Sequence, residues 1–303
     1  MKVLITGGNG FLGSYFVNHW KAKGNEVFTL GRGDNSDLKC NIKDEIPKIN
    51  QDIDYVIHIA GKAHSIPKSK ADEENFYNVN VKGTANLLKG LNQKNIKGFM
   101  FISSVAVYGA KHGSNITEKN NLEATDSYGK TKIEAEKLIT EWGLKENVTI
   151  SIIRPPLIIG KNAPGNLGKM ITGIENGRYF NIADGKAKRS VVLAEDLANF
   201  STELITIGGV YNLTDGFDAS FNQLSDVISK AKNKQKVKNM PLWLAKGIAK
   251  TGDLIEMILK KEAPFSTKKL IQMTTDLTFS SKKASTIGWK PKGVVTNVNL
   301  WMN

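Results

Sequence analysis

The chain has 303 residues, of which 40% are hydrophobic and 23% charged, so it can bury a large core and has the composition of a globular protein. Its single cysteine, Cys40, excludes a disulfide framework and a cysteine-built metal site, and we expect no metal centre. The net charge is +13, but the basic residues are almost all lysines spread along the chain, without the aromatic-interleaved stripe of a nucleic-acid site. We therefore expect a solvated lysine surface and no nucleic-acid partner; the alternative is attraction to anionic substrates or an anionic membrane face.

The first predicted elements are a strand at Val3–Ile5 and a helix from about Phe11 to Lys23, joined by a glycine-rich turn. Gly7 permits the sharp turn, Gly10 lets the backbone approach a pyrophosphate, and Gly13 lets the helix pack closely on the sheet. Phosphates would then face the free N–H groups of the helix N-terminus. This pattern predicts a bound dinucleotide, with a set of contacts that includes Gly7, Asn9, Gly10, Phe11, Leu12 and Gly13.

The start of the chain also bears on its location. The first strand begins at residue 2, which leaves no place for a signal peptide. Apolar runs along the chain fall short of the roughly 18 residues that a membrane-spanning helix needs. We expect a cytoplasmic protein without an integral membrane segment.

Strands and helices alternate through the first two-thirds of the chain. Further strands are predicted at 26–30, 54–60, 98–104 and 148–153, and helices at 71–91 and 126–142. This alternation predicts an α/β fold with a doubly wound parallel Rossmann sheet. After an irregular stretch with an amphipathic segment at 167–176, residues 190–193 and 209–213 are predicted to return to the sheet. We therefore expect a cofactor-binding domain at 1–160 plus about 188–215, and a smaller α/β substrate lobe at 161–187 and 216–303.

The lobe contains a helix-rich segment at 220–262 that is broken at Pro241. Two of its stretches, 241–250 and 254–259, are short and amphipathic. We expect both to be ordinary core helices of the lobe, and the alternative is that they lie on a bilayer surface.

Polar residues with catalytic potential follow the predicted strands. Ser104 ends the strand at 98–104, and Tyr128 and Lys132 stand four residues apart at the start of a helix, which places them on one helix face. An ammonium group near a phenol favours the phenolate, so Lys132 is expected to lower the pKa of Tyr128. Ser104 would then hydrogen-bond the substrate oxygen that Tyr128 protonates or deprotonates. Asn80 is expected to form a water or backbone link to Lys132.

These motifs occur in the order found in the extended short-chain dehydrogenases/reductases, and the chain resembles the nucleotide-sugar epimerase/dehydratase/reductase branch over essentially its full length. The resemblance rests on Thr6–Gly13, His58–Ala60, Asn80–Thr84, Ser103–Gly109, Tyr128–Lys132, Arg154–Pro156, Arg189–Asp196, Asn212–Leu213 and Gly288–Pro291. It implies Tyr128 as acid/base, Lys132 as its pKa-lowering partner and nicotinamide-ribose ligand, and Ser104 as the third catalytic residue. It also implies cofactor contacts from Ala60, Gly61, Asn80 and Pro155, and a homodimer formed by the helices around 71–91 and 126–142.

The end of the second strand bears on the choice of cofactor. An acidic residue there binds the ribose of NAD, whereas a nearby arginine accommodates the 2′-phosphate of NADP. The chain has Gly31 at the acidic position and Arg32 after it, with Asp34 two residues further on. We predict NADP, and NAD is the alternative if Asp34 reaches the ribose.

A preference for NADP favours a net reductase, since epimerases and dehydratases of the family return the hydride to the same substrate and tend to hold NAD. The segments 62–65 and 154–166 resemble the subgroup that acts on UDP-linked 4-keto-6-deoxy N-acetylhexosamines, so we predict NADPH-dependent reduction of such a sugar. The segment Ser103–Gly109 is closer to the 4-epimerases, and an NAD-dependent UDP-hexose 4-epimerase is the alternative. A non-catalytic NAD(P)-binding regulator is a remote alternative, because such proteins typically lack the pair that Tyr128 and Lys132 form here.

Three further residues are candidates for binding the nucleotide-sugar substrate. Arg189 matches a position that often holds a phosphate of the sugar nucleotide in the family. Asn166 precedes the amphipathic segment and either binds the diphosphate or caps the helix. His64, in a loop after the third strand, either contacts substrate or has a structural role.

Overall fold

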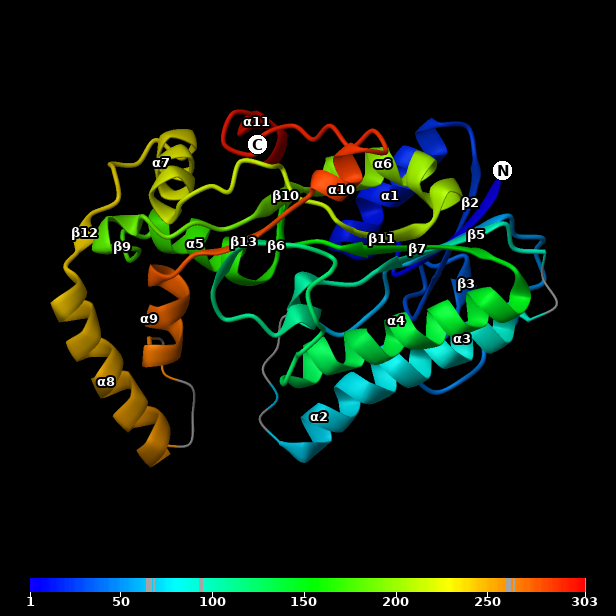
Figure 1. The fold of residues 1–303 in the computed structure, drawn as a ribbon, viewed down its shortest axis with the longest axis horizontal. Coiled ribbons are helices and arrows are strands. Elements are labelled where there is room, and N and C mark those ends of the chain that lie inside the picture. Colours follow the sequence, from blue (N-terminus) through cyan, green and yellow to red (C-terminus); the bar gives the residue numbers. More distant parts are fainter. Residues whose placement is uncertain (64–66, 68, 93–94, 260–262, 264, 303) are drawn as a thin grey trace.

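The computed structural model describes the chain except for residues 64–66, 68, 93–94, 260–262, 264 and 303. Its centre is a parallel sheet of seven strands (Figure 1). In chain order these are β1 (Lys2–Thr6), β2 (Glu26–Gly31), β3 (Leu38–Lys39), β4 (Tyr55–His58), β5 (Gly98–Ile102), β7 (Thr149–Arg154) and β11 (Gly209–Asn212). The spatial order is β11-β7-β5-β4-β1-β2-β3. The direction of winding therefore reverses between β1 and β4, where open α/β sheets bind their ligands.

Helices cover both faces of this sheet (Figure 1). One face carries α1 (Phe11–Ala22), α6 (Ala194–Ile207) and α10 (Lys282–Ser285), and the other carries α2 (Lys70–Tyr77), η1 (Asn78–Lys82), α3 (Gly83–Leu91) and α4 (Ser127–Glu146). This arrangement confirms the predicted doubly wound Rossmann fold. The helix predicted at 71–91 forms with a π-helical turn, η1, at its centre.

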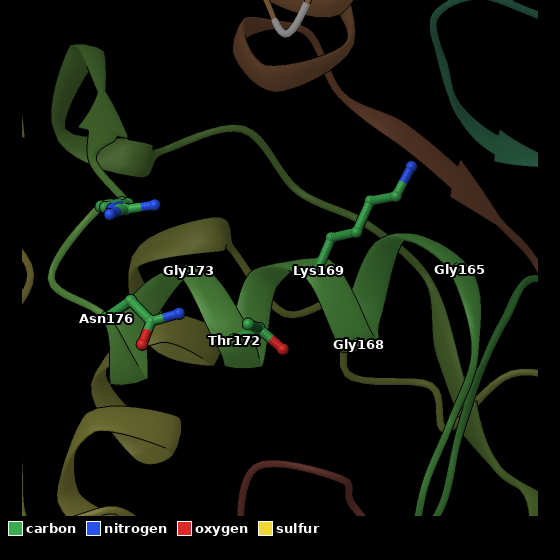
Figure 2. Close-up of a pocket in the computed structure, with 7 residues that line it drawn as sticks. Gly165, Gly168, Lys169, Thr172, Gly173 and Asn176 are labelled. Carbon is green, nitrogen blue, oxygen red and sulfur yellow. The ribbon is translucent and has the colours of Figure 1, made fainter.

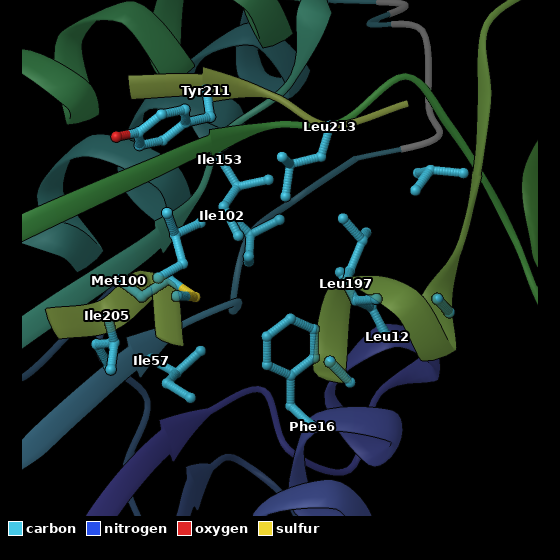
Figure 3. Close-up of a cluster of buried hydrophobic side chains, with 14 of the residues drawn as sticks. Leu12, Phe16, Ile57, Met100, Ile102, Ile153, Leu197, Ile205, Tyr211 and Leu213 are labelled. Carbon is cyan, nitrogen blue, oxygen red and sulfur yellow. The ribbon is translucent and has the colours of Figure 1, made fainter. Parts of the chain in front are cut away.

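Alternate residues of each central strand enter different hydrophobic cores. In β5, Met100 and Ile102 pack on the side of α1 and α6, whereas Phe99 and Phe101 pack on the side of α3 and α4. Figure 3 shows the first of these cores, with Phe16 of α1 and Leu197 of α6 beside strand residues. Because both faces are buried, these strands read as continuous apolar runs.

The strand predicted at 190–193 does not return to the central sheet, so that part of the prediction is wrong. β10 (Val191–Leu193) instead pairs in parallel with β8 (Leu157–Ile159), and β11 alone takes the edge position beside β7. The two strands β7 and β8 are separated by Pro155 and Pro156, which have no N–H to donate to a sheet ladder. The chain therefore leaves the sheet after Arg154.

The remaining elements include two further short sheets, β9 (Asn181–Ile182) with β12 (Asn239–Met240) and β6 (Gly113–Ile116) with β13 (Leu277–Phe279). The other elements are η3 (Ala183–Gly185), α5 (Gly165–Glu175), α7 (Phe221–Ala231), α8 (Leu242–Leu259), α9 (Thr267–Thr274) and α11 (Asn299–Met302). A separate core joins α5 and α7 through Leu167, Ile174, Leu224 and Ile228. The short helix η2 (Val105–Tyr108) follows β5.

The expectation of a core helix is wrong for α8. Its buried residues are Ala245, Ala249 and Gly252, whereas Trp243 is 74% and Met257 71% exposed. The large apolar side chains thus face outward, and α8 lies with α9 at the edge of the molecule (Figure 1). Within the described residues, no helix combines the length and apolar character needed to cross a membrane.

Candidate active site

A cleft of about 970 Å³ opens at the carboxyl ends of the central strands. Its wall contains most of the predicted cofactor and catalytic residues, namely Gly7, Asn9, Gly10, Phe11, Leu12, Gly13, Arg32, Ala60, Gly61, Ser104, Tyr128, Lys132 and Pro155. These residues come from several strand ends and two helix starts, so the fold brings together positions as far apart in the chain as Gly7 and Pro155.

The glycine turn has the geometry that a dinucleotide requires. Gly7 adopts a positive φ of 71°, and a Cβ there would lie 2.9 Å from the backbone nitrogen of Ala60. A Cβ on Gly13 would lie 2.0 Å from the carbonyl oxygen of Gly7, so only glycine lets α1 pack this closely on the turn. Gly10 is the N-cap of α1 and has no side chain to occupy the first-turn N–H groups. These donors therefore remain available for a pyrophosphate, and the residues fit the cofactor.

Hydrogen bonds from Thr6 hold the end of β4 against this turn. Its hydroxyl lies 2.7 Å from Nδ1 of His58 and accepts from the backbone nitrogens of Ile59 and Ala60 at 3.2 Å. Burial lowers the pKa of His58 to about 3, so the ring is neutral and serves as a structural link to Thr84. The chain after β4 is thereby fixed beside the glycine turn.

Tyr128 and Lys132 enter the cleft from the first two turns of α4. The carboxylate of Asp126 caps this helix by accepting from the backbone nitrogen of Gly129 at 3.0 Å. Lys132 is only 4% exposed, donates from Nζ to the carbonyl of Ile102 at 2.8 Å, and lies 6.0 Å from the ring centre of Tyr128. The side chain of Ser104 hydrogen-bonds Tyr128. The structure thus brings the three predicted catalytic residues together.

The predicted lowering of the tyrosine pKa is not found in the protein alone. Desolvation raises the pKa of Tyr128 to about 12, and the hydrogen bond from Ser104 offsets this only in part. Desolvation also lowers the pKa of Lys132 to about 8, with Glu136 opposing the change. Burial is therefore the largest influence on the pKa of both groups, and Tyr128 is a protonated hydroxyl at neutral pH.

A buried ion pair beneath the catalytic residues was not expected from the sequence. Nη2 of Arg154 donates to Glu136 at 2.6 Å, with both side chains 7% exposed or less. Ser103 donates to the same carboxylate at 2.5 Å, and Arg154 also donates to the hydroxyl of Tyr108 at 3.1 Å. Glu136 lies one helical turn beyond Lys132, and this spacing is the signal that would have placed it behind the site.

Asn80 organises the loop after β4 through hydrogen bonds to its backbone. Its amide oxygen accepts from the backbone nitrogen of Lys62 at 2.7 Å, and its amide nitrogen donates to the carbonyl of Lys62 and to Thr131. Both Asn80 and Lys132 lie against Gly61, where a Cβ would be 3.1 Å from the asparagine oxygen. A water-mediated link between Asn80 and Lys132 stays a prediction.

Arg32, the predicted ligand of a 2′-phosphate, stands at the end of β2 near two acidic residues. Arg32 lines the cleft, and no carboxylate stands among the described residues of its wall. Asp34 pairs with Lys39, and Asp37 accepts hydrogen bonds from the backbone nitrogen and hydroxyl of Thr29. Asp37 is thus held by Thr29, whereas the carboxylate of Asp34 is exposed. Sequence reasoning missed the other polar residues of this end of the cleft, which include Asn35, Ser36, Asn41 and Lys43.

Two of the predicted substrate residues, Asn166 and Arg189, do not line the cleft, whereas Ser104 does. His64 falls outside the described residues. Asn166 is exposed in the first turn of α5, whose N-cap is Pro164, so Asn166 does not cap that helix. Arg189 donates to the backbone carbonyls of Lys188, Thr275 and Gln272. Their roles in binding substrate stay predictions.

A second depression of about 520 Å³ runs along α5 (Figure 2). It is lined by Gly165, Gly168, Lys169, Thr172, Gly173, Asn176 and Arg178. The groove therefore carries two positively charged side chains, Lys169 and Arg178, and its glycines have no side chains that would fill it. Pro164 lines the main cleft and Gly165 lines this groove, so the two hollows meet at the start of α5.

Potential metal ligands do not cluster in the part of the chain that the structure describes. Within those ranges, no three histidine, cysteine or acidic residues gather as metal ligands. Cys40 is buried and lines the cleft, and burial raises the pKa of its thiol to about 11. The thiol is therefore protonated at neutral pH.

The Rossmann sheet, the glycine turn and the tyrosine–lysine pair define an NAD(P)-dependent enzyme. A family model described as the NAD dependent epimerase/dehydratase family matches residues 3–213. The chain belongs to this family, which confirms the resemblance drawn from its motifs.

Individual relatives are distant. The chain is 29% identical over 225 residues to the N-acetyl-alpha-D-glucosaminyl-diphospho-ditrans,octacis-undecaprenol 4-epimerase of Escherichia coli O157:H7, covering 71% of this chain and 66% of that protein. It is 26% identical over 245 residues to the GDP-6-deoxy-D-mannose reductase of Pseudomonas aeruginosa, covering 75% and 79%. The structure of the Thermus thermophilus UDP-glucose 4-epimerase in complex with NAD has a TM-score of 0.73 at 20% identity, covering 100% of this chain and 98% of that one.

Proposed function

We propose that this protein catalyses hydride transfer at C4 of a sugar linked to a nucleotide, as an NADPH-dependent reductase of a UDP-4-keto-6-deoxy-(N-acetyl)hexosamine. The observation that carries the proposal is the meeting of Ser104, Tyr128 and Lys132 in one cleft with the glycine turn. The cofactor, when bound, supplies the hydride. The chain itself must then provide a proton, hold the ketone oxygen and position the sugar.

Tyr128 is the proton donor in this proposal. With a pKa of about 12 it is protonated at neutral pH and ready to give its proton to a ketone oxygen. Ser104, which bonds Tyr128, is placed to hydrogen-bond the same oxygen. Lys132 provides a positive charge beside the tyrosine, and this charge stabilises the phenolate that forms as the proton leaves.

Arg32 supports reduction over epimerisation. A guanidinium at the end of β2 suits the 2′-phosphate of NADP, and neither Asp34 nor Asp37 is among the residues that line the cleft. A net reductase consumes reduced cofactor at each turnover, which is the usual task of NADPH in the family. The Pseudomonas aeruginosa relative is named a reductase.

The groove on α5 supports a diphosphate carrier on the sugar. Lys169 and Arg178 provide two exposed cations there, and the groove adjoins the main cleft at Pro164 and Gly165. A sugar in the cleft would thus have its diphosphate near these cations. We also propose Asn166, in the first turn of the same helix, as a diphosphate ligand.

A 4-epimerase is the second candidate. Two of the proteins described above are 4-epimerases, and the segment Ser103–Gly109 is closer to that group. The same three catalytic residues would serve, with the proton moving both ways between Tyr128 and O4. The remote alternative of a non-catalytic regulator is disfavoured by the placement of Tyr128 and Lys132 in the cleft.

The test is to incubate the purified protein with UDP-4-keto-6-deoxy-N-acetylglucosamine and NADPH, and to follow the absorbance of the reduced cofactor. Consumption of NADPH that disappears in Tyr128→Phe supports the reductase. Interconversion of UDP-hexoses with tightly held NAD, and no consumption of NADPH, replaces it with the epimerase. Binding of NADP(H) without turnover of any sugar nucleotide supports the regulator.

A further inference from the structure

Helix α8 presents a broad apolar surface to the outside of the molecule. Its nine large apolar side chains are between 38% and 74% exposed: Leu242, Trp243, Leu244, Ile248, Leu254, Ile255, Met257, Ile258 and Leu259. At 100° per residue, Trp243, Leu254 and Ile258 project from the face opposite the buried side of the helix, and Met257 and Lys250 project beside Trp243. The other apolar side chains lie nearer the buried side and are less exposed on average. We call this surface the α8 face. Helices that expose so large an apolar face in a soluble protein typically bind something through it.

In the described part of the chain, no side chain of the α8 face belongs to a hydrophobic core cluster. The side of α8 that contacts the protein carries Ala245, Ala249 and Gly252. A Cβ on Gly252 would lie 1.8 Å from the carbonyl oxygen of Phe265, so close packing against the segment before α9 depends on a small residue there. The helix is therefore amphipathic in the reverse of the usual sense, with small residues inside and large apolar residues outside.

Charges around the α8 face are divided by sign. The two acids of the helix are turned toward the protein, since Asp253 accepts from the backbone nitrogen of Thr267 at 2.9 Å and Glu256 from that of Ala263 at 2.9 Å. Lys246 and Lys250, by contrast, are exposed on α8. Three more lysines, Lys234, Lys236 and Lys238, precede β12 and lead into the helix. The outer surface thus combines apolar side chains with positive charge.

We propose that the α8 face docks this protein on an anionic phospholipid bilayer, with the helix lying parallel to the membrane plane. Its apolar side chains would enter the boundary between headgroups and acyl chains, and Lys246 and Lys250 would meet anionic headgroups. Trp243 suits this depth, because its ring has an apolar body and a polar N–H. Charge complementarity favours this occupant over a second copy of the chain, which would bring the same lysines to the interface. The proposal goes beyond the proposed function and does not depend on it.

Flotation with lipid vesicles tests the docking. The full-length protein should float with vesicles of phosphatidylcholine and phosphatidylglycerol in equal amounts, and far less with phosphatidylcholine alone. The double substitution Trp243→Glu with Ile258→Glu should weaken binding by at least about tenfold. Leu144→Glu is the matched control, because Leu144 is an apolar residue that is 81% exposed and belongs to α4, a helix that lies against the central sheet rather than beside α8 (Figure 1). It should float like the unmodified protein.

Two further variants separate the parts of the proposal. Lys246→Glu with Lys250→Glu should reduce flotation with the anionic vesicles, and this loss should resemble the effect of high salt. Brominated phospholipids should quench the fluorescence of Trp243, the most exposed of the tryptophans, and the quenching should be lost in Trp243→Phe while flotation persists.

Three results would overturn the proposal. One is failure of the unmodified protein to float with anionic vesicles. Another is equal flotation of the Trp243→Glu, Ile258→Glu variant. The third is a protein that does not bind vesicles but forms a concentration-dependent dimer in analytical ultracentrifugation, with the dimer lost in Trp243→Glu. The occupant of the α8 face would then be a second copy of the chain. Because NADPH binding by the cleft is measured separately, loss of docking is distinguishable from failure of the proposed function.

Discussion

Lys132, the proposed catalytic lysine, is a buried cation whose position costs stability. Lys132 is 4% exposed, lies 4.5 Å from the ring centre of Phe101, and donates one hydrogen bond to a backbone carbonyl. Desolvation lowers its pKa from 10.5 to about 8. The burial of a lysine costs folding free energy. A lysine that is nevertheless buried in a cleft is a candidate for a catalytic role.

Lys132→Met should therefore raise the stability of the protein while removing its activity. At about 1.4 kcal/mol for each pKa unit, the lowering from 10.5 to about 8 corresponds to about 3 kcal/mol, and the lost hydrogen bond reduces the gain to the order of 2 kcal/mol. Below pH 8 the lysine is charged in both states, so the full gain is present. Between pH 8 and 10.5 the unfolded lysine binds more protons than the folded one, so the gain shrinks as pH rises. Urea unfolding at pH 7 and pH 10 measures this, and a less stable variant at pH 7 contradicts it.

Arg32→Ala should weaken NADPH binding without weakening NADH binding. A charge-assisted hydrogen bond to a phosphate contributes about 1.5–3 kcal/mol, so the Kd for NADPH should rise by roughly tenfold to a hundredfold. Cofactor fluorescence, measured without substrate, gives both constants. Arg178→Ala is the control, because Arg178 lines the groove on α5 rather than the cleft. Equal loss for both cofactors, or no loss for either, is incompatible with the role given to Arg32.

Residue spacing predicted that three residues would meet in one site, but it did not predict the electrostatics of that site. Ser104, Tyr128 and Lys132 were found from strand ends and an i,i+4 pair, which depend on local sequence. The pKa of Tyr128 moved opposite to the prediction, because desolvation depends on every group that surrounds the hydroxyl. Asn35 and Lys43 were missed since they enter the cleft around β3, a strand of two residues with no periodicity to detect.

Helix α4 and strand β7 are joined by the buried pair of Glu136 and Arg154. The pair lies directly beneath Ser103 and one helical turn from Lys132, so it sets how α4 sits on the sheet. Each ion is satisfied by several hydrogen bonds, and neither has access to water that could replace its partner.

Glu136→Gln should destabilise the protein by about 3 kcal/mol or more, since it leaves a buried guanidinium without its countercharge. The change would appear as a lower melting temperature and a lower urea midpoint. Glu141→Gln is the matched control on the same helix, because its ion pair with Lys137 is exposed and contributes at most about 0.5 kcal/mol. If Glu136→Gln and Glu141→Gln lost similar amounts of stability, the buried ion pair would contribute no more than the exposed one.

Long elements were predictable, whereas short and irregular ones were not. The central strands and α4 have continuous apolar runs or clear caps, which local patterns reveal. The partner of β10 was mispredicted because a run of three buried residues does not indicate which strand it joins. The hydrophobic periodicity of α8 predicted a helix, but the helix was wrongly expected to lie in a core. An apolar helix face has the same sequence pattern whether it contacts a core or solvent.

At the scale of the molecule, the sheet holds the catalytic residues and the smaller lobe adds the groove on α5 and the α8 face. The predicted boundaries of the two domains and the homodimer through α2, α3 and α4 stay predictions. Helices α2 and α3 follow one another along the chain and lie beside α4 on one side of the sheet (Figure 1). In the predicted homodimer, the stretch at 71–91 and α4 of each protomer would together form a four-helix interface. A cytoplasmic location also stays a prediction.

Isotope transfer tests the central claim most directly. The protein is incubated with UDP-4-keto-6-deoxy-N-acetylglucosamine and NADPH that carries deuterium at the transferable position of its nicotinamide, and the sugar is examined by NMR. A 4-keto reductase should place one deuterium at C4 of a 4-hydroxy product, and the Tyr128→Phe variant should place none. A product without deuterium at C4, or label transfer that persists in Tyr128→Phe, would contradict the claim.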